Sequence, residues 1–196
     1  IDFNLQKIIK NFLGDDFRIS STSTQINEKN NKKGDWHADW PFCVFNGGNI
    51  NKPFPKKVLH ITCIFMLIDF NKNVGSTLVR PRSHLLDTNP TFQGDPYYGS
   101  YDDQVNIEGS AGSVFLMDSR LWHASDTNKS DKRRTSLVVR YAPWWLNLEV
   151  FRPGSYDRKK IIEDKNKFGS LYPSITKIAF DKIDDDVKHL FEHWLE

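Results

Sequence analysis

The amino-acid sequence predicts a mainly β protein, a sandwich or barrel of strands flanked by α-helices. Three observations support this expectation. Short stretches rich in β-branched and aromatic residues dominate the middle of the chain. Clusters of Gly, Pro, Asn and Asp separate these stretches. Apolar residues recur at helical spacing near both ends.

The individual elements follow from these patterns. Residues 2–13 carry apolar side chains at helical spacing and precede Gly14, so we expect a helix there. A second helical stripe covers residues 184–196. Residues 87–106 form a long turn-rich insertion that we expect to overhang a site. We expect strands at residues 17–26, 58–70, 77–79, 112–117 and 135–142.

Length and charge restrict the class of protein. With 196 residues, we expect residues 1–196 to form a single domain. The chain opens on Ile1 rather than Met, and we expect residues to be missing at its N-terminus. A net charge of +2 with interspersed signs argues against nucleic-acid and anionic-membrane partners. The longest apolar run, Ile64–Ile68, is far shorter than the ~20 residues that cross a bilayer.

Cysteine usage bears on the compartment. The two cysteines, Cys43 and Cys63, lie among apolar neighbours. Buried reduced thiols are therefore favoured over a disulfide framework. This favours a cytoplasmic protein.

Two histidines and one aspartate have the spacing of metal ligands. His37 and Asp39 are two residues apart, so on an extended chain both side chains lie on one face and can bind one metal ion. His123 follows a strand-like segment 84 residues after Asp39. Each feature is weak alone, because a surface histidine beside a solvated aspartate has the same appearance.

A nearby arginine strengthens this interpretation. Arg134 opens an apolar strand eleven residues after His123, and such a strand has little reason to begin with two arginines unless one meets an anion. Two histidines and one carboxylate leave three open positions on a metal, which suits Fe(II) and O2 activation. The planar guanidinium binds a carboxylate through two oxygens. Together the residues match the requirements of an Fe(II)/2-oxoglutarate site.

The sequence resembles the phytanoyl-CoA dioxygenase (PhyH) family over most of its length. The segments that carry the resemblance are LGDDF, DWHADW, GSTLVRPRSH, GSAGSVFLMDSRLWHASDTNKSDKRRTSLVVRYAPWW and HLFEHW. The resemblance implies a double-stranded β-helix, a jelly roll of cupin type, with iron near one open end. It also implies that His37, Asp39 and His123 bind iron.

The resemblance assigns cosubstrate contacts as well. It implies that Arg134 binds the distal carboxylate of 2-oxoglutarate, that Ser125 supplies a second contact, and that Ser136 completes an RxS pattern used by related oxygenases. The implied cofactors are Fe(II), 2-oxoglutarate and O2. The implied reaction hydroxylates a C–H bond of a small metabolite and converts 2-oxoglutarate to succinate and CO2.

Two positions depart from the family pattern. Arg82 stands in PRSH where the family usually has glycine, so the backbone there lacks glycine's free access to positive φ. Ala38 lies between His37 and Asp39 where glutamine is frequent and can approach the cosubstrate. One contact is therefore lost or supplied elsewhere.

Other charged and histidine residues have simpler explanations. If the loop of Arg80 and Arg82 borders the iron-containing mouth, these residues would attract an anionic small-molecule substrate; surface solubility is the alternative. His60 lies within an apolar strand and is expected to be a hydrogen-bonded core histidine. His84 is expected to make structural hydrogen bonds. His189 and His193 have a helical spacing that can bind metal, but without a third ligand they are expected to lie on a surface helix.

Two other functions compete with an oxygenase. A cupin-like hydrolase or isomerase would use the same three ligands for Zn or another divalent ion, but it has no need of the carboxylate-binding Arg134. A lectin-type jelly-roll binding module would need no metal, which the pattern His37, Asp39 and His123 argues against.

Overall fold

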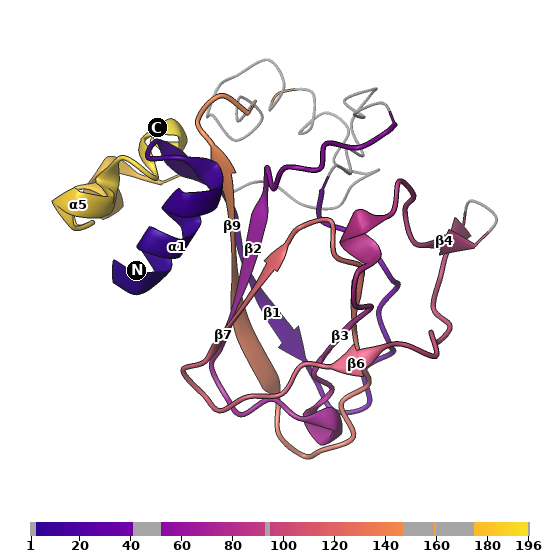
Figure 1. Cartoon of the computed structure of the whole chain (residues 1–196). Helices are drawn as coiled ribbons and strands as arrows, with labels where there is room; N and C mark the ends of the chain where they lie inside the picture. Colours follow the sequence, from indigo (N-terminus) through magenta and orange to yellow (C-terminus); the bar gives the residue numbers. More distant parts are fainter. Residues whose placement is uncertain (1–2, 41–51, 93–94, 147–158, 160–174, 196) are drawn as a thin grey trace. The chain divides into compact units, whose positions relative to one another are not determined.

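The computed structural model describes residues 3–40, 52–92, 95–146, 159 and 175–195 (Figure 1). The chain forms two compact units, one comprising Ile1–Ser21 with Arg140–Glu196 and the other comprising Thr22–Val139. The expectation of a single domain over residues 1–196 stays a prediction. All of the expected site residues belong to the second unit.

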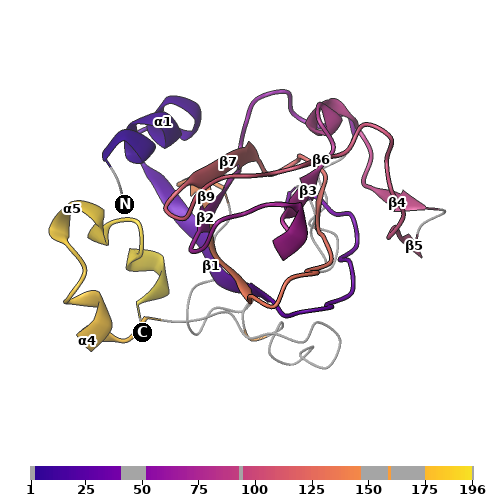
Figure 2. The ribbon, with the colours of Figure 1, turned by 90° about the horizontal axis from the view of Figure 1, so that it is seen from below.

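Antiparallel sheets dominate the described chain, so the prediction of a mainly β fold is confirmed. One four-stranded sheet has the order β1-β9-β2-β7, a three-stranded sheet has the order β6-β3-β8, and β4 pairs with β5. Figure 2 shows β2 and β7 lying opposite β3 and β6. The strands are β1 (Phe17–Asn27), β2 (Ile61–Met66), β3 (Thr77–Val79), β4 (Thr91–Phe92), β5 (Asp95–Pro96), β6 (Val105–Asn106), β7 (Val114–Asp118), β8 (His123–Ser125) and β9 (Arg134–Pro143).

The observed strands match the expected ones in part. The prediction at Thr77–Val79 is confirmed residue for residue, whereas β2 is shorter than the expected 58–70. The insertion at 87–106 is more ordered than expected, because it contains β4, β5 and β6. Strand β8 was not predicted at all. Strands of two or three residues are too short to display a period of two.

The described α-helices lie near the ends of the chain, as expected. Helix α1 (Phe3–Leu13) confirms the first prediction. The expected helix at 184–196 is interrupted: α5 (Asp185–Lys188) ends early and a separate 3-10 turn, η4 (Glu192–Trp194), follows. After this turn, Ile175 N donates a hydrogen bond of 2.9 Å to the Trp194 carbonyl, and Ile175 forms an isolated parallel bridge with Leu195. The structure also describes two 3-10 turns in the middle of the chain, η1 (Lys72–Val74) and η2 (Ser83–Leu85), and the short helix α4 (Lys177–Phe180).

An apolar core fills the interior of the second unit. It contains Ile64, Met66, Phe70, Met117 and Val138, each at most 5% exposed. Side chains two residues apart on a strand share a face. The interior face of β2 therefore carries Thr62 with Ile64 and Met66, and that of β9 carries Arg134 and Ser136 with Val138. Polar residues thus enter the interior on the same strand faces as the core.

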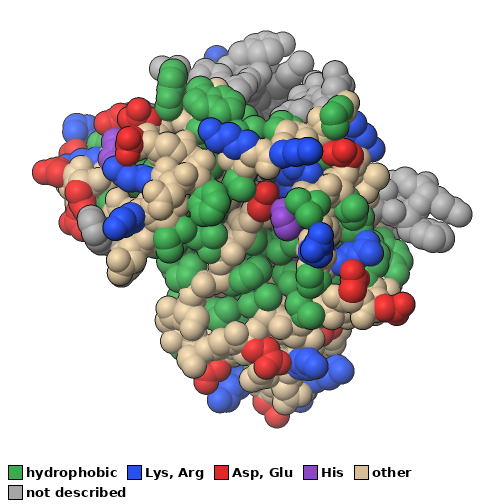
Figure 3. All heavy atoms as spheres, viewed as in Figure 1, with side chains coloured by type: hydrophobic (Ala, Val, Ile, Leu, Met, Phe, Trp, Pro, Cys, Tyr) green, Lys and Arg blue, Asp and Glu red, His purple; other side chains and the backbone are tan. Residues whose placement is uncertain are grey.

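Surface charge and thiol chemistry agree with the composition. Basic and acidic side chains are intermixed on the face shown in Figure 3. Cys63 is a free, buried thiol whose pKa is raised to about 12 by burial, so it is unreactive. Cys43 lies outside the described residues, and a cytoplasmic location stays a prediction. No described helix combines the length and the apolar character needed to cross a bilayer.

Arg82 occupies the left-handed backbone region, with φ 64° and ψ −1°. The conformation that glycine adopts freely is therefore retained here by an arginine, at a cost of about 1–2 kcal/mol. Arg82→Gly is expected to raise the free energy of unfolding by about 0.5–1 kcal/mol, after the greater entropy of glycine in the unfolded chain is subtracted. Urea denaturation measures this change. Arg82→Ala is the control, because it removes the side chain but keeps the strain; equal stabilities of the two variants would contradict the prediction.

Candidate metal centre

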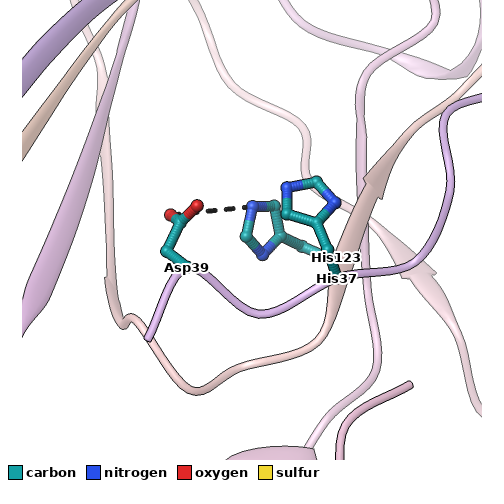
Figure 4. Close-up of side chains that lie close together, drawn as sticks. All are labelled: His37, Asp39 and His123. Carbon is teal, nitrogen blue, oxygen red and sulfur yellow. Dashed lines mark ion pairs between the residues drawn. The ribbon is translucent and has the colours of Figure 1, made fainter. Parts of the chain in front are cut away.

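Three side chains predicted to bind a metal lie together in the second unit. His37, Asp39 and His123 each offer one ligating atom, and these atoms lie within 4.8 Å of one another (Figure 4). In the described part of the chain, this is the one cluster of three such residues. His37 and His123 are direct cross-strand partners, joined by two backbone hydrogen bonds of 2.9 and 3.0 Å. The β-pairing therefore brings together residues that are far apart in sequence.

Alternation along the chain directs the three side chains to one face. The intervening residues Trp36 and Ala38 pack into a second apolar cluster, together with Leu78, Trp122 and Ala124. Burial of these neighbours on one face leaves His37 and Asp39 on the other. Ala38 is thus a packing residue, and the expectation that a cosubstrate contact is lost or supplied elsewhere stays a prediction.

Backbone carbonyl groups fix the ring orientation of both histidines. His37 Nδ1 lies 3.0 Å from Asp35 O, and His123 Nδ1 lies 3.0 Å from Leu121 O. A carbonyl oxygen only accepts hydrogen bonds, so each Nδ1 carries the proton. The Nε2 lone pair of each ring is then available to a metal, which is the usual arrangement of metal-binding histidines.

The carboxylate of Asp39 completes the cluster. Its side chain is 7% exposed, and its Oδ2 lies 3.8 Å from His123 Nε2. Thr62 Oγ1 donates a hydrogen bond of 2.8 Å to the same oxygen. Sequence reasoning missed this contact, because the continuous apolar run around Thr62 gives no indication of which face each residue occupies.

Arg134 and Ser136 form a second polar group on the interior face of β9. Arg134 is 3% exposed and Ser136 is fully buried. Neither Arg134 Nε nor Ser136 Oγ has a hydrogen-bond partner among the described residues. The guanidinium lies over the ring of Phe70, 4.9 Å from its centroid, and burial lowers the pKa of Arg134 to about 10. A buried cation beside an unpaired hydroxyl is suited to binding an anion.

Ser125 lies on β8, two residues after His123 and on the same strand face. Its carbonyl accepts a hydrogen bond of 2.9 Å from Gly34 N. A Cβ atom on residue 34 would lie 2.6 Å from Ser125 Oγ and 3.3 Å from Ser125 N, so a larger residue there would displace the Ser125 hydroxyl. The predicted cosubstrate contact of Ser125 stays a prediction.

The loop arginines differ in their surroundings. Arg80 pairs with Asp103, with Nε 3.0 Å from Oδ1, and its guanidinium lies 4.4 Å from the ring centroid of Tyr101. It also lies over Trp122, on the strand face opposite His123. Arg80 is therefore committed to a structural ion pair. Arg82 is exposed.

The remaining histidines lie outside the triad. His60 is buried and hydrogen-bonded to Ser119, as expected for a core histidine. His189 and His193 lie on different helical turns.

Two opposed antiparallel sheets with this cluster between them define a jelly-roll protein with a candidate metal centre. The model of the phytanoyl-CoA dioxygenase (PhyH) family matches residues 2–136. The chain therefore belongs to the PhyH family, as the sequence motifs predicted.

Two curated relatives are 34% identical to the chain over 80 residues, namely the uncharacterized protein Mb1539 of Mycobacterium bovis and the uncharacterized protein Rv1501 of Mycobacterium tuberculosis. Each match covers 41% of this chain and 28% of the relative. The matched part thus spans less than a third of the length of these relatives.

Solved structures share the fold. HygX from Streptomyces hygroscopicus, with nickel, 2-oxoglutarate and hygromycin B bound, has a TM-score of 0.56 at 14% identity, covering 74% of this chain and 63% of HygX. The epimerase SnoN, in complex with Fe3+, alpha-ketoglutarate and nogalamycin RO, has a TM-score of 0.52 at 20% identity, covering 71% of this chain and 55% of SnoN. These similarities confirm the jelly-roll fold.

Proposed function

We propose that this protein is an Fe(II)/2-oxoglutarate-dependent oxygenase that hydroxylates a C–H bond of a small metabolite. The observation that carries the proposal is that two polar sites lie in the interior of the second unit. One is a cluster of two imidazoles and one carboxylate, and the other is a buried guanidinium without a described anionic partner. Membership of the PhyH family and the iron- and 2-oxoglutarate-containing structures of similar fold support it.

The residues present fit the cofactors. Two neutral histidine nitrogens and one carboxylate suit Fe(II) and leave coordination positions for other ligands. The unpaired Arg134 Nε and Ser136 Oγ match the distal carboxylate of 2-oxoglutarate, which needs charge neutralisation and hydrogen-bond donors when it is buried. Ser125, on the strand face of His123, is the proposed second contact.

Each group of residues has a distinct task in the reaction. His37, Asp39 and His123 would hold the iron, and Arg134 with Ser136 would orient the cosubstrate. The apolar side chains of Ile64, Met117 and Val138 exclude water from the interior. When bound, iron and 2-oxoglutarate supply the oxidising chemistry, in which O2 and 2-oxoglutarate give succinate, CO2 and one oxygen atom for the substrate.

We propose a small anionic molecule as substrate and a cytoplasmic location. The exposed guanidinium of Arg82 supports the former, whereas Arg80 no longer does because it pairs with Asp103. The buried free thiol of Cys63 supports the latter.

Hygromycin B and nogalamycin RO are small molecules bound by proteins of similar fold. A hydrolase or isomerase remains the competing function, but the unpaired interior guanidinium of Arg134 favours the oxygenase.

An anaerobic titration tests the proposal. Fe(II) and 2-oxoglutarate added to the apoprotein are expected to give a visible metal-to-ligand charge-transfer band, and admission of O2 is expected to release succinate. Succinate in place of 2-oxoglutarate is the control and should give no band. Absence of both the band and succinate release would overturn the proposal in favour of a hydrolase or a binding module. Succinate release with candidate anionic metabolites, followed by mass spectrometry for one added oxygen atom, then tests hydroxylation.

A further inference from the structure

A chain of hydrogen bonds extends from Asp39 into the interior. Thr62 Oγ1 donates to Asp39 Oδ2 at 2.8 Å and lies 2.7 Å from Ser119 Oγ, which lies 2.8 Å from His60 Nδ1. Thr62 and Ser119 are fully buried and His60 is 7% exposed. Bulk water therefore does not compete for these bonds, and a lost bond leaves a buried polar group unpaired.

The number of available protons determines which group donates in each of these hydrogen bonds. A carboxylate only accepts, so the single hydroxyl proton of Thr62 is used on Asp39. The short contact between the two hydroxyl oxygens then requires the proton of Ser119. Ser119 has none left for His60, so His60 Nδ1 must be a donor. Every donor in the chain points toward the Asp39 carboxylate, and His60 carries a proton on Nδ1.

Ser119 connects this chain to the backbone of the metal centre. Its carbonyl oxygen accepts hydrogen bonds from Asp39 N at 2.9 Å and Trp40 N at 3.2 Å. Its own N donates to His60 O at 3.0 Å, next to the pairing of Ile61 with Asp118 in strands β2 and β7. One residue thus holds both the main chain of Asp39 and, through Thr62, its side chain.

We propose that Thr62 is a positioning residue for the metal centre. Ser119 is hydrogen-bonded to Thr62, and His60 is hydrogen-bonded to Ser119. The hydroxyl of Thr62 holds one carboxylate oxygen of Asp39 and so fixes the rotamer that points toward His37 and His123. A metal ion then meets a preorganised carboxylate. The inference rests on the proposed function, because it takes the triad to be a metal site. Residues that orient metal ligands in this way are worth about 10- to 100-fold in metal affinity.

Paired substitutions of Thr62 test the role. Thr62→Val keeps the shape of the side chain but removes the hydroxyl, and Thr62→Ser keeps the hydroxyl. Titration of the apoprotein with Co(II) alone, followed by its visible absorption, measures metal affinity without 2-oxoglutarate or substrate. We expect Thr62→Val to weaken Co(II) binding about 10- to 100-fold and to alter the absorption band, and Thr62→Ser to restore both. Thr135→Val is the matched control, because Thr135 lies on the opposite face of β9 from Arg134 and Ser136.

The outcomes separate this inference from the proposed function. If the wild-type protein binds Co(II) and Thr62→Val binds it equally well, the positioning role is overturned while the oxygenase assignment stands. If the wild-type protein does not bind Co(II), both are overturned. Should Thr62→Val fail to fold, nitrogen NMR of His60 in the wild-type protein decides. A protonated Nδ1 supports the chain, and an imidazole protonated on Nε2 alone overturns it.

Discussion

Asp39→Ala is expected to abolish iron binding and the release of succinate from 2-oxoglutarate. The substitution removes the one carboxylate of the triad, and the two neutral imidazoles that remain supply no negative charge to a divalent cation. It also leaves the hydroxyl of Thr62 without its acceptor. Anaerobic Fe(II) titration and a succinate assay measure the two losses.

The control for this prediction is a carboxylate outside the triad. Asp103→Ala removes a carboxylate, in the turn before β6, that pairs with Arg80 beside Tyr101. It should leave iron binding unchanged. Iron affinity retained in Asp39→Ala would show that the triad is not the metal site.

Arg134→Met is expected to weaken 2-oxoglutarate binding strongly and, at the same time, to leave the apoprotein at least as stable as the wild type. Removing one partner of a buried, hydrogen-bonded charge pair costs about 2–5 kcal/mol, which is roughly 30-fold or more in Kd. Without the ligand, however, the guanidinium is a buried charge with no described counter-ion. Methionine fills similar space without that desolvation cost.

Opposite effects on affinity and stability distinguish an anion-binding arginine from a structural one. Thermal unfolding with and without 2-oxoglutarate reports both, because a ligand that binds only the folded state raises Tm. Arg133→Met is the matched control, because the neighbouring Arg133 has a side chain that is 61% exposed and pairs with Glu28. A lower apoprotein Tm in Arg134→Met with unchanged 2-oxoglutarate affinity would contradict the prediction.

The sequence was informative where geometry follows from local spacing. The two-residue separation of His37 and Asp39 places both on one face of any extended segment, whatever the fold. The two arginines that open an apolar strand likewise predicted that one of them meets an anion, and the structure buries Arg134, at 3% exposed. These predictions needed no knowledge of strand pairing.

Features that depend on pairing register could not be predicted from the residues alone. His123 meets His37 only because β8, a strand of three residues, pairs with that segment. Thr62 and Ser119 are joined by the register of β2 with β7, and a continuous apolar run does not show which residues face inward. At Arg82 the residue type was a poor guide. An arginine disfavours positive φ, yet the fold holds its backbone at φ 64°.

The ring anchors of the two candidate iron-binding histidines have a consequence for how this centre tolerates mutation. Both anchors are main-chain oxygens, of Asp35 and Leu121. Every amino acid supplies that oxygen, proline included. Sequence drift at these two positions therefore leaves the imidazole tautomers intact for as long as the chain keeps its path. In an enzyme engineered on this scaffold, the two positions can be varied to reshape the surroundings of the metal, and each histidine keeps its proton on Nδ1.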